Sequence, residues 1–155
     1  MPCGARCVRN ILVDTGAIVA LIRERDPAHE RIVALLAALR GTDQLITTWP
    51  VVTECAFVLE LHRTAFFDWL LESRVEVVDF DLQAVRSMLE WMKGYRDRQI
   101  DFADATLVWL AAARNTDLIV TTDYRDFRTY RLPNRRAFHL LLPEASIRAC
   151  CYDRP

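Results

Sequence analysis

Asn10-Ile11-Leu12-Val13-Asp14-Thr15-Gly16 is the stretch that decides the fold of this 155-residue chain. Its three consecutive aliphatic residues predict a short strand, starting at residue 9, that is buried on both faces, as strands of a parallel sheet are. Asp14 closes the strand, and the aliphatic residues that follow favour a helix over 17–24. A strand that passes directly into a helix is the first half of a βαβ unit.

The rest of the chain repeats this alternation of short apolar strands and helices. Strands that alternate with helices build a parallel sheet with helices on both faces. The predicted fold is therefore α/β, a three-layer α/β/α sandwich with a central, mainly parallel sheet. At about 150 residues per domain, the length predicts one domain, placed at 10–143 with tails at 1–9 and 144–155. Further strands are expected at 45–48, 75–78, 118–122 and 137–142, and further helices at 27–40, 50–63, 64–72, 81–94 and 101–114.

Composition and charge exclude several classes of protein. Hydrophobic residues make up 52% of the chain and charged residues 26%, which argues against intrinsic disorder. No apolar run reaches the roughly 18 residues of a membrane span, and the start lacks the apolar core of a signal peptide, so we expect a cytoplasmic protein without membrane contact. The net charge of −1 predicts no strong overall attraction to nucleic acid. Five arginines nevertheless share one short stretch, at positions 125, 128, 131, 135 and 136.

The cysteines do not predict a disulfide framework, because their number is odd and the expected compartment is reducing. Those in the tails lack the CxxC spacing of a zinc site and are expected to be free thiols. Cys55 lies in an apolar helical run and is expected to be a small buried side chain. The five are Cys3, Cys7, Cys55, Cys150 and Cys151.

Two aspartates stand directly after predicted strands. Asp14 follows the first strand and Asp123 follows the strand at 118–122. In an open parallel sheet, ligands bind outside the carboxyl ends of the strands, so both carboxylates are expected at one edge. A helix N-cap would explain Asp14 alone, and a turn would explain Asp123 alone. Their occurrence at the same edge favours a functional site.

Two further acids lie beside the apolar faces of predicted helices. Glu54 falls about 40° outside the apolar arc of the helix at 50–63, where a carboxylate either has a partner or reaches to water. Asp104 is the more inward-facing acid at the start of the helix at 101–114, where the helix dipole favours an anion. Asp101 is placed to cap that helix, with Asp104 three residues later as in a capping box. The apolar arc around Glu54 consists of Val51, Val52, Cys55, Val58, Leu59 and His62.

These four carboxylates predict a cation site. Acids about 4–6 Å apart repel one another and raise each other's pKa, so such a cluster persists when a cation compensates it. Oxygen ligands suit Mg²⁺ or Mn²⁺ rather than Zn²⁺. A metal that acidifies water beside a bound phosphate is the chemistry of phosphodiester hydrolysis, and nearby arginines could hold the flanking phosphates.

In order and spacing, four segments of the chain resemble the PIN domain family, and within it the VapC-type toxins of bacterial toxin–antitoxin pairs. The resemblance covers about residues 10–143. No single motif is specific for this family, but the occurrence of all four in order over a βαβ pattern is specific for it. They are Val13-Asp14-Thr15-Gly16-Ala17, Thr48-Trp49-Pro50-Val51-Val52-Thr53-Glu54, Asp101-Phe102-Ala103-Asp104-Ala105 and Thr121-Thr122-Asp123-Tyr124-Arg125-Asp126-Phe127.

The resemblance implies an endoribonuclease that depends on Mg²⁺ or Mn²⁺ and acts on single-stranded or looped RNA. It also implies a homodimer and a cognate antitoxin whose C-terminal segment lies in the active-site groove. Many family members carry Ser or Asn where Gly16 stands, so one polar contact is expected to be missing. Asp101 is either a supporting contact or only a helix cap. The implied catalytic and metal-binding residues are Asp14, Glu54, Asp104 and Asp123, with Thr15 and Thr122 as supporting hydroxyls.

Two other functions stay open. A catalytically silent PIN-like module that binds RNA or protein would fit the near-zero charge and Gly16. A receiver domain or an aspartate phosphatase also places Asp at strand ends, but the phosphatase needs a second Asp where Gly16 stands. Both need a lysine near a late strand, and the only lysine, Lys93, lies in a predicted helix.

Large aromatic side chains are frequent for a domain of this size, and core packing would account for them. They also predict a dimer or antitoxin surface built partly from the helices at 50–72. They are Trp49, Phe66, Phe67, Trp69 and Trp91.

Overall fold

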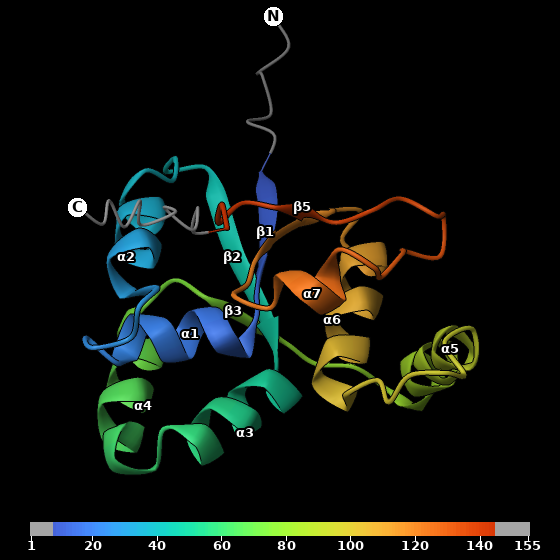
Figure 1. Cartoon of the computed structure of the whole chain (residues 1–155), viewed down its shortest axis with the longest axis horizontal. Coiled ribbons are helices and arrows are strands. Elements are labelled where there is room, and N and C mark those ends of the chain that lie inside the picture. Colours follow the sequence, from blue (N-terminus) through green and yellow to red (C-terminus); the bar gives the residue numbers. More distant parts are fainter. Residues whose placement is uncertain (1–7, 145–155) are drawn as a thin grey trace, which may run out of the picture.

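The computed structural model describes residues 8–144 and contains one five-stranded sheet (Figure 1). The strand order is β3-β2-β1-β4-β5, and every neighbouring pair is parallel. This confirms the predicted α/β fold with a parallel sheet. The strands are β1 (Arg9–Val13), β2 (Asp43–Thr48), β3 (Glu76–Val78), β4 (Leu118–Val120) and β5 (His139–Leu140).

Helices cover the sheet on both sides. In Figure 1, α1, α2 and α4 lie on one side of β1 and β2, and α5 and α6 lie on the other, which gives the three expected layers. Along residues 8–144 no helix is long and apolar enough to cross a membrane. The helices are α1 (Thr15–Ile22), α2 (His29–Ala37), α3 (Trp49–Val58), the 3₁₀ turn η1 (Glu60–His62), α4 (Arg63–Glu72), α5 (Leu82–Lys93), α6 (Phe102–Ala113) and α7 (Tyr124–Phe127).

The core is centred on β1 and α6. The side chains of Ile11 and Leu12 in β1 and of Leu107 and Leu110 in α6 are fully buried. Burial of apolar surface of this kind contributes about 25 cal/mol per Å² to folding. Cys55 is a buried free thiol, as expected, whereas Cys3, Cys7, Cys150 and Cys151 lie outside the described residues.

The helix expected over 50–63 is wrong in its second half. Helix α3 ends at Val58 and the chain continues through η1 into α4. The side chain of Leu59 is fully buried, and the backbone there leaves helical geometry at φ −86° and ψ 10°. The chain then turns. Val58, at the end of α3, and His62, at the end of η1, were expected on the apolar arc, but both are exposed.

Aspartates begin three of the helices whose N-termini lie near the carboxyl edge of the sheet. Asp14 is the N-cap of α1, Asp101 of α6 and Asp123 of α7, and each side chain accepts a backbone N–H of its helix. Such caps satisfy backbone donors that the helix cannot satisfy itself. The capping that starts these helices therefore also fixes three carboxylates.

Candidate active site

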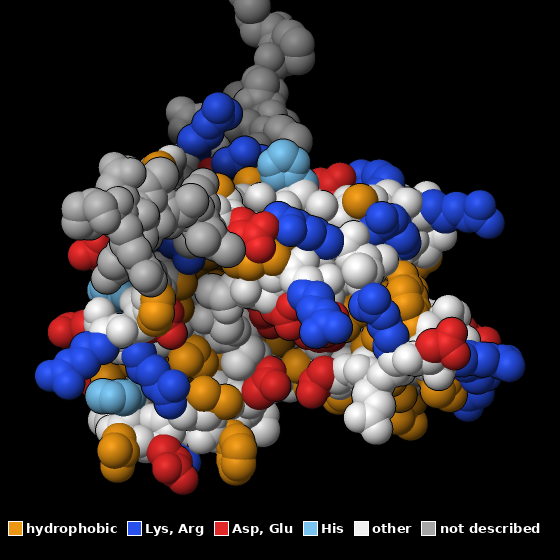
Figure 2. Space-filling model, viewed as in Figure 1, with side chains coloured by type: hydrophobic (Ala, Val, Ile, Leu, Met, Phe, Trp, Pro, Cys, Tyr) orange, Lys and Arg blue, Asp and Glu red, His pale blue; other side chains and the backbone are white. Residues whose placement is uncertain are grey.

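The four predicted acids come from four places in the fold that meet at the carboxyl edge of the sheet. Asp14 follows β1 and Asp123 follows β4, and these strands are neighbours with Val13 opposite Val120. Glu54 lies in α3 and Asp104 lies in the first turn of α6. Figure 2 shows acidic side chains gathered near the middle of this face, over the region where α1, α3, α6 and α7 begin in Figure 1.

Asp14 is the most enclosed of the four, with 5% of its surface exposed. Its Oδ1 accepts the Thr15 backbone N–H at 2.7 Å, and its Oδ2 accepts the Thr121 hydroxyl at 2.7 Å. The Thr121 Oγ1 in turn accepts the backbone N–H of Asp123 at 2.8 Å. Thr121 therefore ties the first acid to the last. The sequence analysis missed it, although its place at the end of β4, two residues before Asp123, was a signal that could have been used.

Thr15 connects the second acid to the first. Its hydroxyl donates to Glu54 Oε2, while its backbone N–H donates to Asp14. Glu54, half-buried on α3, thus has the hydrogen-bond partner that its position beside the core requires. Because one residue holds both carboxylates, the spacing of Asp14 and Glu54 is set by the first turn of α1.

Asp104 is held by a residue that the sequence analysis also missed. Its Oδ2 accepts the hydroxyl of Tyr130 at 2.9 Å, rather than making the return bond of a capping box. Asp101 makes the cap alone, accepting the Ala103 N–H at 2.8 Å. Asp123 accepts the Asp126 N–H at 3.0 Å, so the expected turn contact is present beside the acid cluster.

Burial and mutual repulsion raise the pKa of two of the acids. Burial raises the pKa of Asp14 to about 6, the negative charges of Glu54 and Asp123 add to this, and the Thr121 and Thr15 hydrogen bonds oppose it. Burial, followed by the charge of Asp14, raises the pKa of Asp104 to about 7, against the hydrogen bond from Tyr130. Within residues 8–144, no arginine or lysine forms an ion pair with any of the four carboxylates.

The donor set fits a hydrated divalent cation. In the part of the chain that the structure describes, no three His, Cys, Asp or Glu side chains are arranged to enclose a metal ion. Mg²⁺ keeps several waters and takes only one or two protein carboxylates, so it does not need such an enclosure. The oxygen ligands and the uncompensated negative charge match that ion and Mn²⁺. Asp14, Glu54, Asp104 and Asp123 are the residues that could hold it.

Gly16 leaves room for the hydroxyl of Thr122. A Cβ at position 16 would overlap Thr122 Oγ1, so a side chain and this hydroxyl cannot both occupy the space. Thr122 forms no side-chain hydrogen bond with the other described residues, unlike Thr15 and Thr121. The Thr122 hydroxyl, two residues beyond β4, thus occupies the space that the side chain of a Ser or Asn at position 16 would need.

Basic side chains lie on the α7 side of the acids (Figure 2). Arg125 lines a surface pocket together with Thr122 and Asp123. Arg128 is paired with Glu144 at 2.7 Å, and Arg98 lies 3.6 Å from Asp126. Arg125 has no ion-pair partner among the described residues, so its charge is available to a ligand at the acid cluster.

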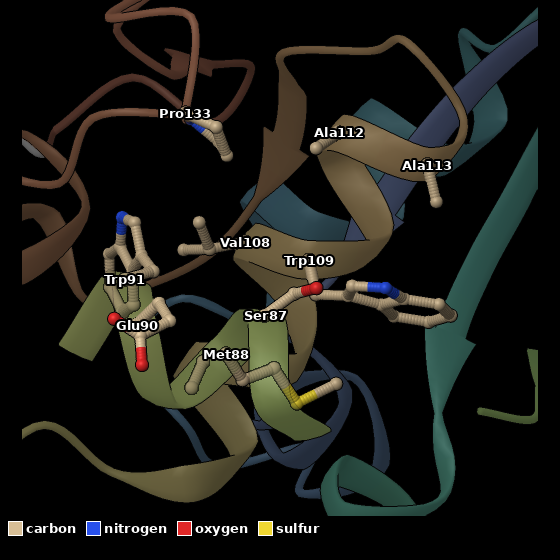
Figure 3. Close-up of a pocket in the computed structure, with 10 residues that line it drawn as sticks. Ser87, Met88, Glu90, Trp91, Val108, Trp109, Ala112, Ala113 and Pro133 are labelled. Atoms are coloured by element: carbon tan, nitrogen blue, oxygen red, sulfur yellow. The ribbon is translucent and has the colours of Figure 1, made fainter. Parts of the chain in front are cut away.

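A separate cavity lies between α5 and α6, away from the acids (Figure 3). It has a volume of about 540 Å³ and an apolar lining that includes Met88, Trp91, Val108 and Trp109. Ala105 also lines it, although its neighbour Asp104 belongs to the acid cluster. The acid cluster and this cavity are therefore separated by α6.

Three solved structures share the fold. VapC20 of Mycobacterium tuberculosis, described as a sarcin-ricin loop cleaving toxin, is 22% identical, with a TM-score of 0.67 over 74% of this chain and 91% of that chain. VapBC2 from Rickettsia felis, solved bound to a DNA fragment from its promoter, is 20% identical, with a TM-score of 0.58 over 81% and 94% of the two chains. VapBC-1 from nontypeable Haemophilus influenzae is 20% identical, with a TM-score of 0.61 over 86% and 99%.

Comparison of the sequence itself gives the family. No curated protein matches the sequence. The family model of the PIN domain, however, matches residues 11–132, which include all four acids. The match spans most of the chain and agrees with the all-parallel fold. This chain belongs to the PIN domain family.

Proposed function

We propose that this protein is an endoribonuclease that depends on Mg²⁺ or Mn²⁺ and hydrolyses RNA phosphodiester bonds, as the toxin of a type II toxin–antitoxin pair. The observation that carries the proposal is the group of four carboxylates at the carboxyl edge of the sheet. Two of them have raised pKa values, and the described chain gives none of the four a cationic partner. Carboxylates with raised pKa values and no cationic partner are typical of active sites.

The residues divide the proposed work between them. Asp14, Glu54, Asp104 and Asp123 would hold the divalent ion, one or two of them as direct ligands. The bound ion would supply an acidified water and offset negative charge on the phosphate. Thr121 and the Thr15 backbone keep both oxygens of Asp14 in place. Arg125, beside Asp123, binds a phosphate that flanks the one attacked.

RNA is the proposed substrate. The similar protein VapC20 is described as cleaving the sarcin-ricin loop, which supports this choice. Arginines at 125 and 128 lie next to the acids in α7 and at its end. Arginine binds phosphate oxygens through two parallel hydrogen bonds, without reading the base sequence. The arginines therefore support RNA binding, and leave the choice of RNA to other contacts.

An antitoxin and a second copy of the chain are the proposed protein partners. Two of the similar structures carry VapBC in their names. In the present structure, large apolar side chains are exposed along α3, η1 and α4, where the sequence predicts a partner surface. Large apolar side chains exposed on consecutive elements favour an interaction site; Phe66, one of the expected aromatic residues, is instead fully buried. The exposed residues are Trp49, Phe57, Val58, Leu61, Phe67 and Leu71.

The test is cleavage of a fluorescent single-stranded RNA in Mn²⁺ buffer. Asp14→Asn and Asp104→Asn are expected to lose at least about 100-fold in rate, because removing a group that orients a metal ligand already costs 10–100-fold. Asp43→Asn, at the opposite edge of the sheet, is the control and is expected to keep the wild-type rate. EDTA should abolish cleavage by the wild type.

The silent binding module gives the opposite result. Wild-type protein would then bind the RNA with an affinity that falls with salt, but would yield no product at any Mn²⁺ concentration. Equal rates in wild type, Asp14→Asn and Asp104→Asn would also reject the proposed nuclease, since the product would then come from a contaminant.

A further inference from the structure

Tyr130 makes a contact with the acid cluster that the proposed mechanism does not use. Its side chain is 1% exposed, and its hydroxyl donates to Asp104 Oδ2 at 2.9 Å. Tyr130 lies just beyond α7, whereas Asp104 lies in the first turn of α6. The bond therefore joins two separate elements at the edge of the sheet.

The aromatic ring of Tyr130 is fixed by packing on several sides. It meets Trp91 and Phe127 edge-to-face, with ring centroids 5.4 Å away in each case, and Tyr95 at 5.8 Å. Trp91, seen in Figure 3 on α5, donates its indole N–H to Arg131 O at 2.8 Å. Because ring geometry of this kind is specific, the hydroxyl is carried to one position.

The neighbouring backbone is fixed as well. The Arg131 N–H donates to the Tyr95 hydroxyl at 2.8 Å, so residues on both sides of the ring anchor the segment.

The same segment also holds Asp123. The Tyr130 N–H donates to Asp126 O at 3.1 Å, and the Asp126 N–H donates to Asp123 Oδ1 at 3.0 Å. One short stretch, 123–130, thus fixes one acid at its beginning and a second acid at its end. The relative position of Asp104 and Asp123 depends on this stretch.

We propose that Tyr130 is a positioning residue for the metal site: its hydroxyl holds Oδ2 of Asp104 so that Oδ1 meets the divalent cation. Oδ1 of Asp104 has no hydrogen-bond partner within residues 8–144. The proposal rests on the proposed function, because it gives Asp104 the role of a metal ligand. Hydrogen bonds that orient ligands in this way typically contribute 10–100-fold to metal affinity or activity.

The test is the Mn²⁺ dissociation constant of the metal-free protein, measured by isothermal titration calorimetry. Tyr130→Phe keeps the ring and removes only the hydroxyl, and it is expected to weaken Mn²⁺ binding about 10-fold. The kcat for RNA should fall while the KM stays within twofold. Thr116→Val is the matched control, since it also removes one buried hydroxyl, which donates to Asn10 O at 2.7 Å and contacts no acid; its Mn²⁺ affinity is expected to be unchanged.

A double-mutant cycle separates positioning from structural support. In an Asp104→Asn background, Tyr130→Phe is expected to leave the Mn²⁺ affinity unchanged, because the carboxylate on which it acts is gone. An equal loss in both backgrounds overturns the proposal, as does no loss in either. Unfolding of Tyr130→Phe at 25 °C, with Thr116→Val still folded, also overturns it, because the hydroxyl would then be a structural group.

The wild-type titration distinguishes the two proposals. If wild type and Tyr130→Phe bind Mn²⁺ with the same affinity, only the role of Tyr130 is overturned. Wild type that binds no Mn²⁺, while Asp14→Asn behaves the same, overturns the proposed metal site and the positioning role with it.

Discussion

Carboxylates at the two edges of the sheet differ in their partners and in the direction of their pKa shifts. At the amino edge, Arg9 forms two hydrogen bonds with Asp43 at 2.7 and 2.9 Å, and this guanidinium holds the pKa of Asp43 below its ordinary value. Arg136 lies 3.7 Å from Asp117 at the same edge. At the carboxyl edge, burial raises the pKa of Asp14 and Asp104.

This difference separates charge that supports the fold from charge that the proposed function assigns to a cation. An arginine within reach of Asp14 would lower its pKa, as Arg9 does for Asp43. The carboxyl edge instead satisfies its carboxylates with hydroxyl and N–H donors, which leave the negative charge in place. The protein therefore gives up stability at the edge where it would bind a cation.

The largest expected effect is stabilisation by metal at one edge only. Mn²⁺ at about 100 times its dissociation constant is expected to raise the free energy of unfolding of the wild type by about 2.7 kcal/mol. Asp14→Asn should show little of this, and Asp43→Asn should show all of it. Thermal unfolding of the three proteins with and without Mn²⁺ measures the effect. Equal shifts in all three would place the metal elsewhere.

Next in size is the effect of a side chain at Gly16. Gly16→Ala is expected to destabilise the protein by about 1–3 kcal/mol, as overpacking does, because the new Cβ overlaps Thr122 Oγ1. Adding Thr122→Ala should recover most of the loss. Gly41→Ala is the control at the other edge, since a Cβ there meets nothing within 4 Å. Urea denaturation gives the values; no recovery in the double variant would disprove the steric explanation.

A third effect concerns pH in the metal-free protein. The pKa of Asp14 is about 6 in the folded state against an ordinary 3.8, and that of Asp104 is about 7. The folded state therefore binds more protons than the unfolded chain from about pH 4 to 7, so the free energy of unfolding falls as pH rises through this window. Protons and Mn²⁺ compete for the same carboxylates, so Mn²⁺ affinity should rise over the same window.

At pH 8, Asp14→Asn is expected to be more stable than metal-free wild type by about 1–2 kcal/mol, since each pKa unit corresponds to about 1.4 kcal/mol and the amide loses part of the hydrogen bonding. Asp43→Asn should be less stable than wild type, because the lowered pKa of Asp43 contributes stability above its unfolded pKa. Melting temperatures from pH 5 to 8 show both signs. A destabilised Asp14→Asn at pH 8 would mean that hydrogen bonding outweighs desolvation.

The smallest effect is expected for the exposed arginine of the amino edge. Arg136→Ala removes one partner of a surface ion pair, 3.7 Å from Asp117, and such pairs contribute little to stability. Its melting temperature should shift less than that of any variant above, and the shift should shrink in 1 M NaCl because salt screens exposed charges. A salt-independent shift would mean that packing of the arginine stem, rather than its charge, stabilises this edge.

Much of the fold could be predicted from the sequence because strand and helix patterns are local. The apolar run before Asp14 and the run at 118–120 both form strands of the all-parallel sheet. The end of α3 could not be predicted in the same way. A regular helix of about 100° per residue would place His62 on the apolar face. In the structure the helix ends at the buried Leu59, so His62 no longer follows that periodicity.

The acids and one support, Thr15, could be proposed from sequence, but Thr121 and Tyr130 could not. Thr121 is 107 residues from Asp14, and Tyr130 is 26 residues from Asp104. No helical or strand period relates positions so far apart, since these contacts are set by the strand order and by the aromatic cluster. Thr15 and Thr122 were the expected supporting hydroxyls. Thr15 does donate to Glu54, whereas Thr121, brought to Asp14 by the register of β1 with β4, replaces Thr122.

The adjacency of β1 and β4 also determines when during synthesis the acid cluster can be completed. A nascent chain that ends before β4 already contains Asp14, Glu54 and Asp104, yet β1 still lacks one of its two neighbours. Pairing over so long a separation forms late in folding, because the chain must close a large loop first. Fragments that stop short of Thr121 are therefore expected to lack the proposed nuclease activity, which would require the last part of the domain, from β4 onward.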